Sequence, residues 1–323
     1  MQRYVTYVAL VAVFGAGMGV GAWYVGTTDS ASKQVRLGEG RLTNPLLECD
    51  IGENTIAAEK INFASPLKSF ITDLENTLSI DEVAVYFRDL NNGPTFGINQ
   101  DDPFVPASLL KVPVMMAYFK RAESEPSVLT QRLAFTRHQT NITDQQVAPE
   151  QTLALGDEYT VNQLIERMIR YSDNESLILL FQELPIADQV HLYNLLGVDQ
   201  AVISNPQASL SVKQYAAFFR ILFNASFLNQ EYSERALSLL SESTFIGGLR
   251  AGVPKEVVVA HKFGERRIAT TGQQHLHDCG IVYYPDHPYL LCIMTRGSSI
   301  ETLERGVAEI STFVYKKIDE QYR

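Results

Sequence analysis

The chain has 323 residues, 46% of them hydrophobic, and a formal charge of −10. This length can bury one large or two closely packed domains. The net negative charge and the lack of a basic cluster argue against a nucleic-acid partner. The three cysteines (Cys49, Cys279 and Cys292) are too few for a disulfide framework and lack the paired spacing of a zinc site.

The amino terminus contains an uncharged apolar stretch over residues 4–26. It is long enough to span a bilayer, whereas a cleaved signal peptide would have a shorter apolar centre and a nearby cleavage site. We therefore expect residues 1–28 to form a cytoplasmic stub and a transmembrane signal anchor. Residues 29–62 are predicted to be a linker, and residues 63–323 a folded domain outside the cytoplasm, at the cell surface or in the periplasm.

Hydrophobic spacing predicts the elements of the folded domain in chain order. Apolar residues three and four apart predict a helix over 65–78, and alternation predicts a β-hairpin from strands 83–87 and 96–98. A second helix is expected to begin near residue 108. Residues 122–158 are polar and irregular and predict a long loop. The Thr160–Gln163 capping box then starts another helix.

The rest of the chain divides into helices and then strands. Further helices are predicted over 177–181, 210–223 and 232–240, strands over 257–264, 279–284 and 289–294, and a last helix after Ser299. Strands at both ends with helices between them predict one sheet built from both ends of the domain and a helical insertion. Cys279 and Cys292 fall on neighbouring strands, where we expect buried free thiols, with a cross-strand disulfide as the alternative.

A serine and a lysine lie three residues apart at Ser108 and Lys111, where an apolar run begins. On a helix these side chains share a face, so a neutral Lys111 amine could take the proton of Ser108 and make it a nucleophile. The pair alone is weak evidence, because a serine near a helix start followed by a solvated lysine is common.

Two further motifs follow in order: Ser172-Asp173-Asn174 and Lys262-Phe263-Gly264. This ordered set resembles the class A β-lactamase family of penicillin-recognising serine hydrolases. The resemblance runs from the helix near 65 to the last helix. It implies an α+β, β-lactamase/transpeptidase-like fold, in which an antiparallel sheet with flanking helices packs on an all-helical subdomain and the active site lies between them.

The chemistry of acyl transfer assigns a nucleophile to Ser108 and a base to Lys111. A lysine base needs a pKa nearer 7 to 8 than its usual value of about 10.4, which burial and the positive charge of Lys262 could produce. The resemblance implies further roles: Ser172 relays protons, Asn174 binds the substrate side chain, and Lys262 attracts the substrate carboxylate. It also implies that the backbone N–H of Glu265, after Gly264, completes an oxyanion hole with that of Ser108.

Two departures from the family pattern affect the mechanism. Phe263 replaces the hydroxyl residue that normally donates to the substrate carboxylate. No glutamate lies between Glu183 and Glu231, where the family carries the base that activates the deacylating water. Loss of a general base typically slows a step by about 10² to 10⁴, so we expect acylation with slow deacylation unless Asp199 or another carboxylate substitutes.

The sequence therefore predicts a serine hydrolase that opens β-lactam amides without a cofactor. Two alternatives stay open: a D,D-peptidase or transpeptidase acting on cell-wall peptides, and a non-catalytic peptidoglycan-binding relative. His261, His275 and His277 surround the third motif, but they lack a recognisable ligand spacing and we expect no metal.

Overall fold

The computed structural model describes residues 42–44, 63–91, 94–138, 145–205 and 208–323. The predicted membrane anchor lies outside the described residues, as does most of the predicted linker. Among the helices that the structure describes, none combines the length and the apolar character needed to cross a bilayer.

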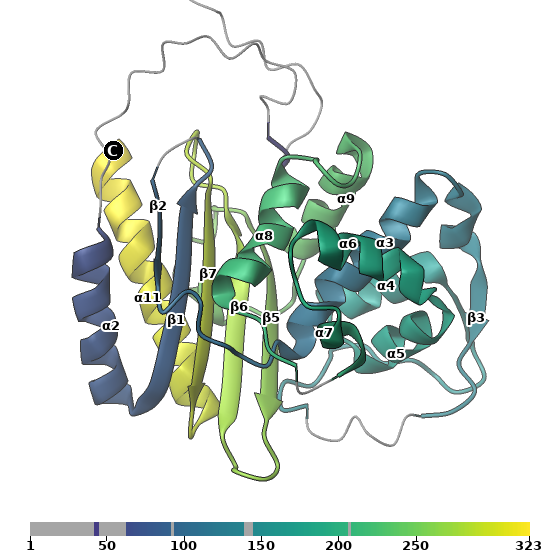
Figure 1. Cartoon of the computed structure of the whole chain (residues 1–323), viewed down its shortest axis with the longest axis horizontal. Coiled ribbons are helices and arrows are strands. Elements are labelled where there is room, and N and C mark those ends of the chain that lie inside the picture. Colours follow the sequence, from purple (N-terminus) through teal and green to yellow (C-terminus); the bar gives the residue numbers. More distant parts are fainter. Residues whose placement is uncertain (1–41, 45–62, 92–93, 139–144, 206–207) are drawn as a thin grey trace, which may run out of the picture. The chain divides into compact units, whose positions relative to one another are not determined.

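One five-stranded antiparallel sheet organises the domain, with strand order β2-β1-β7-β6-β5 (Figure 1). Its strands are β1 (Ile80–Asp89), β2 (Thr95–Ile98), β5 (Val259–Arg267), β6 (Gln274–Val282) and β7 (Tyr289–Gly297). The first two strands come from one end of the domain and the last three from the other, as the sequence pattern predicts. Because β5 is an edge strand, one side of its backbone is open to other segments.

Helices cover both faces of this sheet (Figure 1). The helices α2 (Ala64–Leu78) and α11 (Ile300–Tyr322), with the short α10 (Gly248–Ala251), pack on one face. The helix α8 (Val212–Phe223) packs on the other and continues into the helical subdomain. Strand β7 is buried on both faces, so its sequence is almost continuously apolar.

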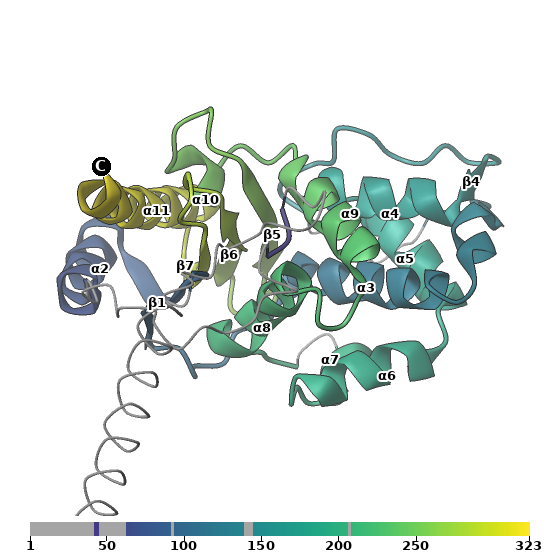
Figure 2. The same cartoon turned by 90° about the horizontal axis from the view of Figure 1, so that it is seen from above.

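The helical subdomain lies beyond the β5 edge (Figure 2). Its elements are η1 (Ala107–Leu110), α3 (Lys111–Ala122), η2 (Pro126–Thr130), α4 (Val161–Arg170), α5 (Asn174–Glu183), α6 (Ile186–Leu195), α7 (Ala201–Ser204) and α9 (Gln230–Ser241). The Thr160–Gln163 capping box starts α4 as predicted, and the Asp173 carboxylate caps α5. The predicted loop over 122–158 instead contains η2 and strand β3 (Arg132–Ala134), which pairs with β4 (Glu158–Thr160).

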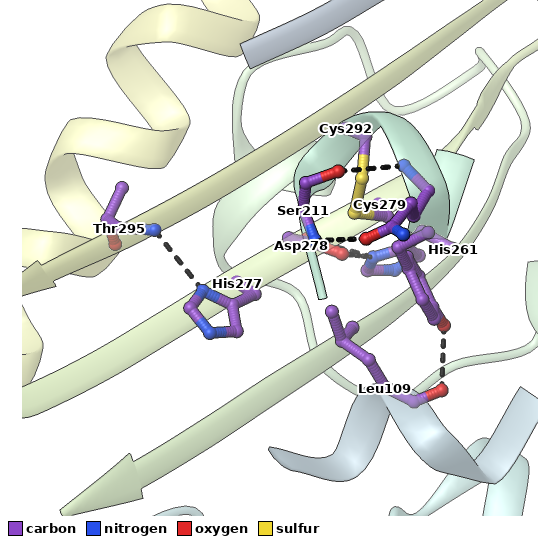
Figure 3. Close-up of a disulfide and its surroundings, with 10 residues drawn as sticks. Leu109, Ser211, His261, His277, Asp278, Cys279, Cys292 and Thr295 are labelled. Atoms are coloured by element: carbon purple, nitrogen blue, oxygen red, sulfur yellow. Dashed lines mark hydrogen bonds and ion pairs between the residues drawn. A yellow bond between two sulfur atoms is a disulfide. The ribbon is translucent and has the colours of Figure 1, made fainter. Parts of the chain in front are cut away.

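The cysteines of β6 and β7 are joined by a disulfide, so the expectation of free thiols was wrong and the alternative holds (Figure 3). The strand register places Cys279 directly opposite Cys292, with Cα atoms 3.9 Å apart. Both side chains point into the core shared with the helical subdomain. The bridge therefore fixes the two central strands beside the site.

A short piece of the predicted linker packs on the folded domain. The backbone N–H groups of Leu42 and Thr43 donate to the Glu234 carboxylate at 2.9 Å, and the Tyr283 hydroxyl donates to the Leu42 carbonyl at 2.8 Å. Thr43 is buried. Glu234 belongs to α9 in the helical subdomain, and Tyr283 directly follows β6 of the sheet. Residues 42–43 therefore contact both the helical subdomain and the sheet.

Candidate active site

Ser108 lies in the η1 turn, directly before α3. In a 3₁₀ turn the residues i and i+3 eclipse one another, which places Ser108 over Lys111. Ala107, immediately before Ser108, has a φ of 50°, an uncommon conformation for a residue with a side chain and one that concentrates at functional sites. The nucleophile candidate is therefore held on a strained turn.

The edge strand β5 contacts the η1 turn at Gly264. A Cβ atom at Gly264 would lie 3.0 Å from the Leu109 nitrogen and 3.1 Å from the Ser108 nitrogen. Both distances are tighter than ordinary van der Waals contact. The glycine of the third motif is therefore needed for the close approach of the β5 backbone to the backbone of the Ser108 turn.

Two side chains hydrogen-bond to the backbone of this turn and of the residue that leads into it. The Tyr215 hydroxyl donates to the Leu109 carbonyl at 2.8 Å. His277 Nε2 donates to the Val105 carbonyl at 2.9 Å, while its Nδ1 accepts from the Thr295 backbone N–H. Burial lowers the pKa of His277 to about 3, so the ring is neutral and keeps this one tautomer.

Lys111 is fully buried at the centre of the site. Its Nζ lies 2.9 Å from Ser108 Oγ, 2.6 Å from the Ser172 carbonyl, 3.0 Å from Ser172 Oγ and 2.6 Å from Asn174 Oδ1. Burial lowers the pKa of Lys111 to about 7, although the charges of nearby Asp173 and Glu265 oppose this change. The structure thus brings the first two motifs into direct contact.

Lys262 joins the third motif to the same cluster. Its buried Nζ donates to Ser172 Oγ at 2.9 Å and to the Phe263 carbonyl at 2.9 Å. Burial, and then the positive charge of Lys111, lower the pKa of Lys262 well below its usual value. Ser172 adopts a φ of 55° and its hydroxyl bridges the two amines. A hydroxyl between two amines is suited to passing protons.

The ring of Phe263 is buried in the core that includes α10 and α11, beside the amine of Lys262. It stacks on Phe245 with ring centroids 4.1 Å apart, and the Lys262 ammonium lies 4.2 Å from its centroid. The substitution of a hydroxyl residue by Phe263 therefore exchanges a hydrogen-bond donor for buried aromatic packing.

The side chain of Glu265 belongs to the site, which the sequence analysis missed because it considered only the backbone of this residue. Its Oε1 accepts from the backbone N–H groups of Gln146 and Val147, at 2.8 and 3.3 Å. Its Oε2 is buried and has no hydrogen-bond partner among the described residues. Burial raises the pKa of Glu265, against the effect of those two backbone hydrogen bonds and of the positive charges of Lys111 and Lys262.

Asn174 is already hydrogen-bonded to a neighbouring segment. Its Nδ2 donates to Gln145 Oε1 at 2.9 Å, and Gln145 Nε2 donates to the Ser172 carbonyl at 3.2 Å. The adjacent Gln146 reaches the sheet, where its Nε2 donates to Gln274 Oε1 at 2.5 Å. The segment therefore crosses from α5 to β6, and a substrate that uses the Asn174 amide has to displace Gln145.

Asp199, the carboxylate suggested as a substitute base, acts as a local cap. It is exposed, and its Oδ1 accepts from the Ala201 backbone N–H at 2.8 Å, at the start of α7. Asp173 is likewise engaged, because its oxygens accept from the backbone N–H groups of Glu175 and Ser176. Both oxygens of Asp173 are thus engaged, and no hydrogen bond within the described residues joins Asp199 to Ser108 or Lys111.

The three histidines near the third motif have separate environments. His261 Nδ1 lies 2.8 Å from the Asp278 carboxylate, and His277 is engaged as described above. Burial lowers the pKa of His275 to about 4. Within the described residues, no three His, Cys, Asp or Glu side chains are grouped as metal ligands.

Comparison with known proteins gives one family match that covers most of the chain. A family model described as the beta-lactamase enzyme family matches residues 66–318. The extended-spectrum beta-lactamase PER-1 of Pseudomonas aeruginosa is 24% identical over 238 residues, which are 68% of this chain and 77% of PER-1.

Solved structures share the fold. A class A beta-lactamase from Mycobacterium abscessus superposes with a TM-score of 0.66 at 23% identity and covers 78% of this chain and 99% of its own. A mutant of PBP-A, described as an acyl-enzyme complex with penicillin G, superposes with a TM-score of 0.66 at 20% identity, over 79% of this chain and 97% of its own.

Proposed function

This chain belongs to the beta-lactamase enzyme family, and from that premise we propose that it is a serine hydrolase that opens β-lactam amides through an acyl-enzyme on Ser108. Ser108 Oγ forms an ester bond with the carbonyl carbon, the C–N bond of the lactam breaks, and the serine proton passes to the leaving nitrogen. Water then hydrolyses the ester, and we propose that this second step is slow.

The observation that carries the proposal is the set of partners around Lys111 Nζ. Two of them, the Ser172 carbonyl and Asn174 Oδ1, are pure acceptors at 2.6 Å and take two N–H groups. A neutral amine then directs its lone pair toward the hydroxyls, of which Ser108 Oγ is nearest at 2.9 Å. With a pKa of about 7, a large fraction of Lys111 is neutral at physiological pH.

The other groups have roles that follow from their positions. Ser172 Oγ contacts both amines and would return the proton to the leaving nitrogen. The backbone N–H groups of Ser108 and Glu265 would hold the oxyanion, which typically contributes a few kcal/mol. Asn174 would bind the acyl side chain once Gln145 is displaced, and Lys262 would supply positive charge.

Slow deacylation follows from the carboxylates available. No glutamate lies between Glu183 and Glu231, and Asp199 caps α7. The same feature supports the second candidate function, a D,D-peptidase or transpeptidase that forms the acyl-enzyme with a cell-wall peptide. The PBP-A mutant was solved as a penicillin acyl-enzyme, and we propose that this chain forms a comparable adduct.

Fluorescent penicillin and intact-mass spectrometry test both steps. We expect covalent labelling of the wild-type protein, no labelling of Ser108→Ala, and an adduct that persists after excess penicillin is removed. Rapid loss of the adduct with high turnover would refute slow deacylation. Failure of the folded wild-type protein to label would favour a non-catalytic peptidoglycan-binding relative.

We also propose that residues 4–26 anchor the protein in a membrane, with the catalytic domain outside the cytoplasm. The supporting observation is the length of this uncharged stretch. Fractionation of cells that express the full chain and a form starting at residue 29 tests it. We expect the full chain in the membrane fraction and the shorter form in the supernatant. Recovery of the full chain in the supernatant of washed membranes would contradict the anchor.

A further inference from the structure

The β5 edge offers few donors to an anionic substrate group. The ammonium of Lys262 is buried and already donates to Ser172 and to the Phe263 carbonyl. Phe263 has no hydroxyl, and its ring is stacked in the core against Phe245. Both donors that the family resemblance assigns to a substrate carboxylate are thus committed or missing.

Glu265 adds a carboxylate to the same strand, three residues after Lys262 and one residue after Gly264. Gly264 touches the Ser108 turn. Glu265 Oε1 accepts from the backbone of Gln146, and the adjacent Gln145 contacts Asn174 and the Ser172 carbonyl, so this carboxylate lies against the segment that borders the reaction centre. Glu265 is only 9% exposed, and Oε2 has no hydrogen-bond partner among the described residues. A buried acceptor without a donor is costly, and a ligand N–H would satisfy it.

We propose that Glu265 makes this site select substrates that carry an uncharged amide, rather than a carboxylate, beside the scissile bond. This inference rests on the proposed acylation of Ser108 and names its substrate class. A substrate carboxylate placed near Glu265 meets a like charge, which disfavours association. An amide carries no charge and presents an N–H donor to Oε2, and sites built around a specific hydrogen bond discriminate strongly against analogues that cannot form it.

The substrate class is therefore a peptide that continues past the scissile bond or ends in a carboxamide, and among β-lactams a carboxamide derivative. The test compares benzylpenicillin with the derivative in which its carboxylate is a primary carboxamide. The rate constant of Ser108 adduct formation is measured for each compound by intact-mass spectrometry at neutral pH. The ratio of the two constants is taken within one protein sample, so a misfolded fraction cancels.

For the wild-type protein we expect the carboxamide to react at least about tenfold faster than the acid. In Glu265→Gln, which keeps the Oε1 acceptor for Gln146 and Val147 but removes the charge, the ratio should fall to about one. Glu158→Gln is the matched control, because this exposed carboxylate pairs with Arg132 on the β3–β4 ribbon. Its ratio should equal that of the wild type.

Two results would overturn the inference: a wild-type protein that prefers the free acid, or a ratio that Glu265→Gln leaves unchanged. Modification of Ser108 by neither compound has a different meaning. In that case the proposed acylation itself fails, and the selectivity proposed for Glu265 fails with it.

Discussion

The pKa of Lys111 should set the pH dependence of Ser108 acylation. A lysine of ordinary pKa is neutral in roughly one molecule in a few thousand at pH 7, whereas a pKa of about 7 leaves half of the amines neutral. Moving the pKa from 10.5 to about 7 corresponds to about 5 kcal/mol of differential stabilisation. Burial thus raises the concentration of active base by about three orders of magnitude.

Lowering the pH protonates Lys111 and removes its lone pair. We therefore expect the single-turnover acylation rate to be nearly constant above pH 7 and to fall about tenfold per pH unit below it. Stopped-flow measurement with a chromogenic cephalosporin across this range gives the profile. A flat profile, or an acid limb with its midpoint near the ordinary lysine pKa, would refute the assignment of Lys111 as the base.

Two variants separate Lys111 from its neighbour. Lys111→Arg keeps the positive charge but cannot lose its proton, so acylation above pH 7 should fall by about 10² to 10⁴ and the residual rate should lose the acid limb. Lys262→Gln should keep the acid limb, because that limb belongs to Lys111. If the limb disappears in Lys262→Gln and persists in Lys111→Arg, the roles of the two amines are exchanged.

Three structural features give further predictions. Gly264→Ala places a Cβ 3.1 Å from the Ser108 nitrogen and should slow acylation by at least about tenfold and lower the melting temperature, because the crowded atoms are backbone atoms; single-turnover kinetics and thermal melting check this. His277→Phe should destabilise the domain by about 1 to 3 kcal/mol in urea unfolding, because the Val105 carbonyl loses its donor. Reduction of Cys279–Cys292 should lower the unfolding free energy by about 2 to 3 kcal/mol, and equal urea midpoints with and without reductant would contradict this.

The proximity of the candidate site residues could be predicted because its signals are local in sequence. Ser108 and Lys111 are one turn apart, and three motifs in fixed order place Ser172 and Lys262 beside them. The two predicted strands likewise place Cys279 and Cys292 on neighbouring strands, and the register sets them directly opposite each other. The pattern did not predict their oxidation state, which depends on side-chain geometry and on the redox environment.

The contacts that the sequence did not reveal join segments without periodicity. Gln145 and Gln146 lie in a stretch that was predicted to be irregular, yet they bind Asn174 on α5 and Glu265 on β5. Such contacts depend on the path of a loop across two folded parts. The side chain of Glu265 was missed for the same reason, since alternation indicates the face of a strand but not the loop that covers it.

Acylation and deacylation make different demands on this fold. Acylation needs a base beside Ser108. The first residue of α3, Lys111, is the candidate, because its buried amine contacts Ser108 Oγ. Deacylation needs a carboxylate that can hold water, and Asp173 and Asp199 are already used as helix caps. Glu265 Oε2 has no partner in the part of the chain that the structure describes, but Oε1 holds the Gln146 segment against the sheet. Moving it toward a water would break the contacts with Gln146 and Val147, so we expect the contacts that order the acylating groups to slow the release of the acyl group.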